Sequence, residues 1–218
     1  FLVMIGITIA IVLNLFYDYE GQRQDLIRYM RETENQLQIL LCELAAYLHN
    51  KDMEINVWDR IIAFEGRMHE FIKAAYDYQD NTFHSHPGFY IDYFEMRLAQ
   101  LQVLHNLHYE IKKIRKMPKQ ALVIADYIMY MADYVVEMNI PDQQIEKLEE
   151  ISEQMKQEEL PKTREEFEGR ALLYHILMDL EEFLVYKKRF VNGLDEKKLR
   201  IYWKQEMEQK DSANELQK

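Results

Sequence analysis

The chain has 218 residues and carries 27 lysines and arginines against 38 aspartates and glutamates, a formal net charge of −11. A chain this acidic repels polyanions, so we expect no nucleic acid among its partners. Its single cysteine, Cys42, cannot form an internal disulfide, which fits a reducing compartment. With only six glycines and four prolines, the composition is poor in turn formers and predicts an all-α fold.

Residues 1–17 contain no charged side chain and are almost entirely aliphatic or aromatic. A helix of this length spans about 25 Å, slightly less than the ~30 Å hydrocarbon core of a bilayer. We therefore predict a transmembrane helix here, with the lipid bilayer as its partner. Two alternatives stay open. One is a secretory signal peptide, although neither a basic start nor a cleavage site is visible, and the other is a buried core helix.

The residues around this apolar segment bear on its orientation and its context. Arg23, Arg28 and Arg31 follow it closely, and positive residues favour the cytoplasmic side of a membrane. The chain opens on Phe1 rather than methionine, so we expect the numbering to begin inside a larger gene product. The sequence thus predicts the last membrane helix of a multi-pass plasma-membrane protein, with the residues from about 21 onward in the cytoplasm.

Apolar side chains recur at helical spacing along most of the remaining chain. Residues 22–49 carry a continuous stripe that follows the apolar start closely, so the two segments can form one rod about 70 Å long. Further helices are predicted over residues 54–78, 88–116, 119–139 and 142–157 and, after a capping box at Thr163, up to residue 190. Residues 119–139 are apolar nearly all round, so this helix should be the most buried.

These elements predict an all-α fold, an elongated antiparallel helical bundle of about five to six helices that continues from a transmembrane helix. We divide the chain into the end of a membrane domain at residues 1–20, a cytoplasmic helical bundle at residues 21–193 and a polar C-terminal tail at residues 194–218. The polar composition at the end of the tail is typical of disorder.

Motifs for catalysis or metal binding are weak. Helical bundles hold metals through Glu-x-x-His pairs, and none of the seven histidines has a glutamate three residues earlier. His84 with His86, and His105 with His108, could each begin a metal site, but we interpret the first pair as solvated and the second as histidines at the edge of the core. Cys42 lies among leucines and is interpreted as a small buried apolar residue. We expect no catalytic residues, no metal, no cofactor and no enzymatic activity.

The most unusual patch is aromatic and covers residues 76–97. Within it, Tyr90, Tyr93 and Phe94 precede Arg97. Aromatic faces beside a guanidinium can hold a planar carboxylate by stacking and by a bidentate salt link, so these four are the candidate ligand-binding residues. The alternative is that the rings close the end of the bundle while tyrosine hydroxyls reach water.

Three segments carry a family resemblance: FLVMIGITIAIVLNLFY at residues 1–17, YIDYFEMRLAQ at residues 90–100 and LPKTREEFEGRALLYHIL at residues 160–177. Through them the chain resembles the aromatic acid exporters, the fusaric-acid-resistance-like transporters, and in particular their C-terminal cytoplasmic domain with the last transmembrane helix. The resemblance implies a bacterial multi-pass membrane protein that exports small aromatic acids. It supplies no catalytic or substrate residues. The residues that match its motif are interpreted as structural, and they are Thr163, Arg164, Glu166, Phe167 and Arg170.

The resulting hypothesis is that the bundle regulates, dimerises or structurally supports a transporter. Its partners would be the membrane half of the same polypeptide and a second copy of the chain. Two alternatives stay open: a signalling or scaffold bundle anchored by a single membrane helix, and a sensor domain that binds small aromatic acids.

Overall fold

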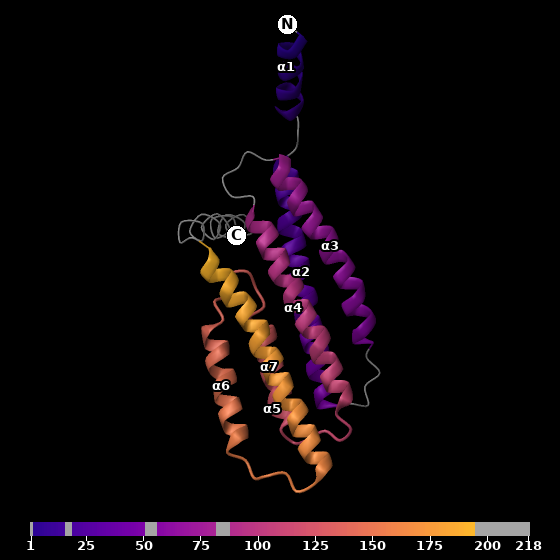
Figure 1. Ribbon diagram of the computed structural model, residues 1–218, viewed down its shortest axis with the longest axis vertical. Helices are drawn as coiled ribbons and strands as arrows, with labels where there is room; N and C mark the ends of the chain where they lie inside the picture. The colour runs from indigo at the N-terminus through magenta and orange to yellow at the C-terminus, as the bar shows by residue number, and fades with distance from the viewer. Residues whose placement is uncertain (1, 16–18, 51–55, 82–87, 195–218) are drawn as a thin grey trace, which may run out of the picture.

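A computed structural model describes residues 2–15, 19–50, 56–81 and 88–194 (Figure 1). Within these ranges the chain forms seven α-helices and no strand, which confirms the predicted all-α bundle. The helices are α1 (Leu2–Leu15), α2 (Tyr19–His49), α3 (Val57–Asn81), α4 (Gly88–Lys113), α5 (Ala121–Ala132), α6 (Asp142–Lys156) and α7 (Arg164–Gly193).

The bundle is elongated because its four long helices, α2, α3, α4 and α7, run alternately up and down the same axis (Figure 1). α4 lies at the centre and packs against α3, α7 and α2, while α2 also packs against α3 and α5. The shorter α6 lies on the outside, against α7 and α5. This is the predicted antiparallel arrangement, with six helices in the bundle itself.

The apolar stripes read from the sequence form the core. On α2, Leu26, Leu37, Leu44 and Leu48 are at most 1% exposed, and the apolar faces of α3, α4 and α7 are buried in the same way. Burying one such side chain contributes roughly 1.5–3 kcal/mol, so these stripes dominate the stability of the bundle.

The helix predicted over residues 119–139 is shorter than expected and is not buried on all sides. α5 ends at Ala132, where tighter turns replace the helical ladder, including bonds from the Tyr134 amide to the Met131 carbonyl and from the Val136 amide to the Tyr134 carbonyl. Its outward side chains Leu122, Val123 and Met129 are 44–48% exposed, because the helix packs against α2, α6 and α7 on one side only. Seven of its twelve residues are nevertheless buried, a share similar to the fourteen of 26 in α4, so the helix is heavily buried but on one side only.

The apolar start of the chain forms α1, which contacts none of the other described helices (Figure 1). Its described side chains are exposed, from 44% at Ile5 to 73% at Val3, so the alternative of a buried core helix does not describe this segment. No helix among the described residues combines the length and the apolar character that crossing a membrane requires. Residues 16–18, at the predicted continuous junction with α2, lie outside the described residues, as does the tail from residue 195.

Candidate functional site

The four predicted ligand-binding residues lie inside the bundle. Tyr90, Tyr93, Phe94 and Arg97 are at most 4% exposed. The rings pack against each other and against neighbouring helices; Tyr93 meets Phe94 edge-on at 5.4 Å and the ring of Phe190 on α7 at 5.9 Å. Burial raises the pKa of Tyr90 to about 12. These four residues are thus part of the core, and what distinguishes them chemically is the buried arginine.

Arg97 belongs to a set of charged residues that we call the charged cluster: Arg31 and Glu34 of α2, Arg97 of α4, Glu137 after α5 and Lys187 of α7. All but Arg31 are at most 5% exposed. Arg31 links the two carboxylates, with contacts of 2.9 Å to Glu34 and 3.1 Å to Glu137. Arg97 Nη2 lies 3.6 Å from Glu34 Oε1. Four separate segments therefore bring their charges to one place.

Neutral polar groups complete the surroundings of the cluster. The Tyr93 hydroxyl donates to Glu34 at 3.1 Å, and Arg97 Nη1 donates to the Gln100 side-chain oxygen at 2.9 Å. The Gln100 amide in turn donates to the backbone carbonyl of Phe183 at 2.8 Å, which ties α4 to α7. Lys187 Nζ donates to the backbone carbonyl of Glu137. Buried polar networks of this kind fix the register of helices because each member needs its partner.

The electrostatic balance at Lys187 is unusual. Burial is the largest cause that holds the pKa of Lys187 well below its ordinary value, and the charge of Arg97 acts in the same direction. The carboxylates of Glu34 and Glu137 oppose this effect. Strongly shifted groups gather at functional sites more often than elsewhere. We therefore take the charged cluster as the candidate functional site.

The residues of the cluster other than Arg97 were not singled out from the sequence, although a signal exists. Glu34 stands four residues after Met30 and three before Leu37, on the buried face of α2. Lys187 follows Phe183 by four residues on α7 in the same manner. A charged residue three or four positions from buried apolar residues of the same helix is the pattern that would have identified Glu34 and Lys187. Glu137 lies beyond the helical periodicity and offers no such signal.

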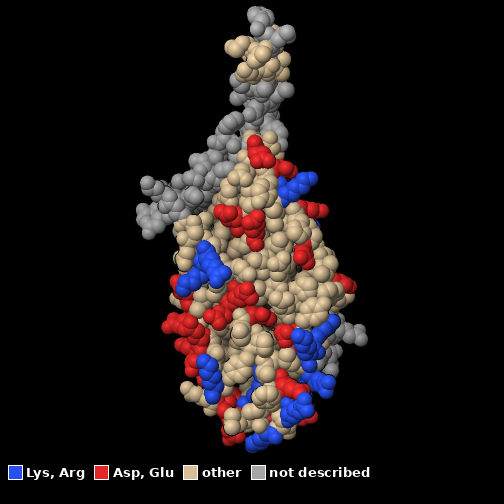
Figure 2. Space-filling model, viewed as in Figure 1, with Lys and Arg blue, Asp and Glu red and all other residues tan. Residues whose placement is uncertain are grey.

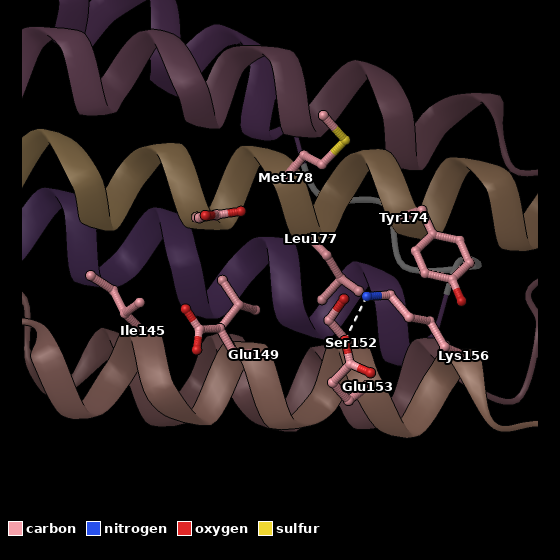
Figure 3. A pocket seen from close by; sticks show the side chains of 10 residues that line it. Ile145, Glu149, Ser152, Glu153, Lys156, Tyr174, Leu177 and Met178 are labelled. Carbon is pink, nitrogen blue, oxygen red and sulfur yellow. Dashed lines mark hydrogen bonds and ion pairs between the residues drawn. The ribbon is translucent and has the colours of Figure 1, made fainter.

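A larger hollow lies between α6 and α7, with a volume of about 300 Å³ (Figure 3). Its lining includes the buried Leu148 and Leu177 and the carboxylates of Glu149 and Glu181. Lys156 donates to Glu153 of the same helix at 2.6 Å, as the dashed line in Figure 3 shows. These charged side chains are exposed, so water screens them and the groove holds a charged ligand far less firmly than the buried cluster could.

The predicted edge-of-core histidines pack around a tryptophan. The ring of Trp58 lies 4.5 Å from His105 and 6.3 Å from His108. Burial lowers the pKa of His108, and Lys112 and His105 add to this effect. Among the described residues no three metal-ligating side chains gather; His84 and His86 lie outside the described residues. Burial, together with Asp133 and Glu43, raises the pKa of Cys42, which is the opposite of what a nucleophilic thiol requires.

The family-motif residues build the start of α7. The Thr163 hydroxyl accepts from the Glu166 amide at 3.1 Å, which confirms Thr163 as the predicted N-cap, and the Glu166 carboxylate accepts from the amide of Lys162, one residue before the cap, at 2.9 Å. Arg170 contacts Glu166 at 2.6 Å and donates to the Glu159 carbonyl at 2.7 Å, which joins the helix to the preceding connection. Arg164 pairs with Glu168 on the surface, and Phe167 is 62% exposed.

Comparison with known proteins gives three findings. The family model described as "Putative aromatic acid exporter C-terminal domain" matches residues 23–188. The "Uncharacterized protein YqjA" of Bacillus subtilis (strain 168) is 26% identical over 191 residues, which are 87% of this chain and 58% of that protein. The chain therefore spans a little over half the length of this relative.

A solved structure, that of a "putative membrane protein" from Clostridium difficile 630, shares the fold. It superposes with a TM-score of 0.69 at 24% identity, and the match covers 77% of this chain and 97% of the other. The family is associated with membrane transport and is not a class of enzymes. Because the family model covers most of the chain, this protein belongs to the aromatic acid exporter C-terminal domain family.

Proposed function

We propose that this chain is the cytoplasmic C-terminal domain of a multi-pass plasma-membrane transporter of aromatic acids. In this proposal residues 1–20 end the membrane domain, residues 21–193 form the cytoplasmic bundle and residues 194–218 form a polar tail. The bundle translocates nothing itself. It stabilises or regulates the transporter by docking against the membrane half or by forming a homodimer.

The observation that carries the proposal is the apolar and exposed helix α1 at one end of a charged bundle. Figure 2 shows lysines, arginines and acidic residues scattered over the bundle, whereas the described surface of α1 is free of them. Exposed aliphatic side chains are unfavourable in water and favourable in lipid by roughly 25 cal/mol for each Å². Family membership supports the same assignment.

The path from α1 into the bundle supports a regulatory role. Three residues separate the end of α1 from the start of α2, which brings Arg31 and Glu34 into the charged cluster. A displacement at the start of α2 would therefore act on the buried contacts of α4 and α7. The exposed side chains of Leu122, Val123 and Met129 on α5 offer an apolar surface for docking or dimerisation.

Insertion of three glycines beside Gly21 in the full-length transporter tests this coupling. Flexible residues there should uncouple the bundle from the membrane half and change the export of benzoate-like acids from membrane vesicles. The control is the same insertion after Asn50, at the opposite end of α2. If export after the insertion at Gly21 equals that of the protein without an insertion, the proposal that α2 couples the bundle to the membrane half is contradicted.

A reporter fusion tests the orientation. A fluorescent protein that matures only in the cytoplasm, fused after Lys218, should be bright in cells expressing the full-length protein. A dark fusion at normal expression would place the bundle on the other side of the membrane and contradict the proposal.

A further inference from the structure

Among the described residues, no carboxylate lies at hydrogen-bond distance from two buried cations of the charged cluster, Arg97 and Lys187. Glu34 and Glu137 both contact Arg31, at 2.9 and 3.1 Å. Arg97 reaches Glu34 only at 3.6 Å, and its Nε has no acceptor among the described residues. Lys187 donates to a backbone carbonyl, which carries no formal charge. An ion this deeply buried normally has an oppositely charged partner, because desolvation is otherwise too costly.

Arg97 and Lys187 line the same small hollow. Its walls come from α4, α5, the α5–α6 connection and α7, and they include Gln100, Met131, Tyr134 and Phe183. The hollow has a volume of about 10 Å³, which by this measure corresponds to one water-sized particle. Two positive side chains and apolar walls at that size suit a small anion. An aromatic ring is much larger than this space.

We propose that the hollow between Arg97 and Lys187 binds one halide ion such as chloride, a single-atom anion close in size to a water molecule. The guanidinium offers Nε–H and the ammonium offers its remaining protons, and hydrogen bonds between such charged partners are stronger than neutral ones. The bound anion links α4 to α7 beside the existing Gln100–Phe183 bond. Binding here does not require α1 to lie in a membrane.

Anion binding is coupled to the proton on Lys187. Arg31 and Glu34 of α2, Tyr93 and Arg97 of α4, and Tyr134 and Glu137 beyond α5 are the charged or titratable groups around this lysine. Arg97 favours the neutral amine, and a bound anion favours the ammonium. The affinity should therefore fall about tenfold for each pH unit above the pKa of Lys187, as the linkage of one proton requires.

Thermal unfolding of the whole chain in detergent tests the site. Sodium chloride and sodium bromide at constant ionic strength should each raise the melting temperature relative to sodium acetate and sodium gluconate, whose anions are larger than the hollow. Lys187→Met keeps the length of the side chain and removes its charge, so this variant should lose the response. Lys188→Met is the matched control, since Lys188 is half-exposed and pairs with Asp142 at 2.8 Å; it should respond as the parent does.

The larger anions show whether the response comes from this hollow. A rise in melting temperature with chloride and bromide but not with acetate supports a halide site. No response to either halide, an equal response to acetate, or an undiminished response in Lys187→Met would overturn the proposal. A bromide-soaked crystal gives a measurement that does not depend on the variants: anomalous density between Arg97 and Lys187 supports the site, and its absence there contradicts it.

Discussion

Charged residues at inward positions of apolar helices are the main feature of this molecule at the scale of single residues. Glu34, Arg97 and Lys187 occupy places where a leucine would otherwise stand. Replacing a whole buried ion cluster by apolar residues is often neutral or stabilising, whereas removing one member leaves its partner unpaired. The cluster therefore does not show that the bundle is unusually stable. It does indicate that each charged member depends on its partners, so that removing one of them destabilises the fold.

Glu34→Gln tests this requirement. The amide fills the same space but removes the carboxylate that lies next to both Arg31 and Arg97. The free energy of unfolding should therefore fall by about 3 kcal/mol. The control is Glu32→Gln, because Glu32 pairs with the exposed Arg67 at 2.7 Å and its loss should change stability by less than about 1 kcal/mol. Urea denaturation measures both. Equal losses of unfolding free energy in Glu34→Gln and Glu32→Gln would show that burying Glu34 with its partners makes its charge no more important than that of an exposed residue.

Asp179 makes stability depend on pH. Its carboxylate is half-buried, and burial, followed by the charges of Glu110 and Glu182, raises the pKa to about 6. The ionised form is thus disfavoured in the folded state, so stability is lost as the pH rises from about 4 to about 6 and stays lower above that.

Asp179→Asn removes this penalty. Above pH 6 the variant should be more stable than the parent by about 1 kcal/mol, a value that allows for solvent screening of a partly exposed group. Below pH 4 the two should be equally stable. Chemical denaturation at pH 3.5 and pH 7 measures the difference, with Asp126→Asn on the exposed side of α5 as the control. A difference that is the same at both pH values would contradict the assignment.

At the scale of elements, the start of α7 shows how a local motif fixes a tertiary contact. The capping box sets where the helix begins, and Gly169 on its second turn then lies against the connection between α4 and α5. A Cβ atom at this position would lie 2.9 Å from Pro118 Cγ and 3.3 Å from the Lys116 carbonyl oxygen. Only a residue without a side chain allows this approach.

Gly169→Ala should therefore reduce the free energy of unfolding by about 1–3 kcal/mol, as overpacking does. Gly66→Ala is the matched substitution in the exposed interior of α3, where no atom lies within 4 Å of the added methyl group. There the change should stabilise the protein by about 0.5–1 kcal/mol, because alanine favours a helix more than glycine does. Thermal melts of both variants give opposite shifts if the contact with Pro118 is real, and shifts of the same sign if it is not.

At the scale of the whole molecule, α1 and the bundle are separate bodies of opposite character. The bundle has a complete apolar core of its own, whereas the described part of α1 buries nothing against it. A chain that begins at Tyr19 should therefore unfold with a free energy within about 0.5 kcal/mol of that of the longer chain, since distant sites act independently.

The same truncation should abolish co-sedimentation with phospholipid vesicles, because it removes the exposed aliphatic surface. Circular dichroism and vesicle sedimentation measure the two effects on one pair of proteins. A large loss of stability would show that α1 is part of the core, and continued vesicle binding would show that the bundle itself carries the affinity for lipid.

The sequence by itself determined the helices and the faces that they bury, because apolar periodicity and the capping box at Thr163 depend on residues only three or four positions apart. It did not reveal that Arg31 meets Glu137 across 106 positions of sequence, or that Gln100 bonds to Phe183. It also could not show that the outer side of α5 is left uncovered. These features depend on which helix faces meet, and only the packing of the whole bundle decides that.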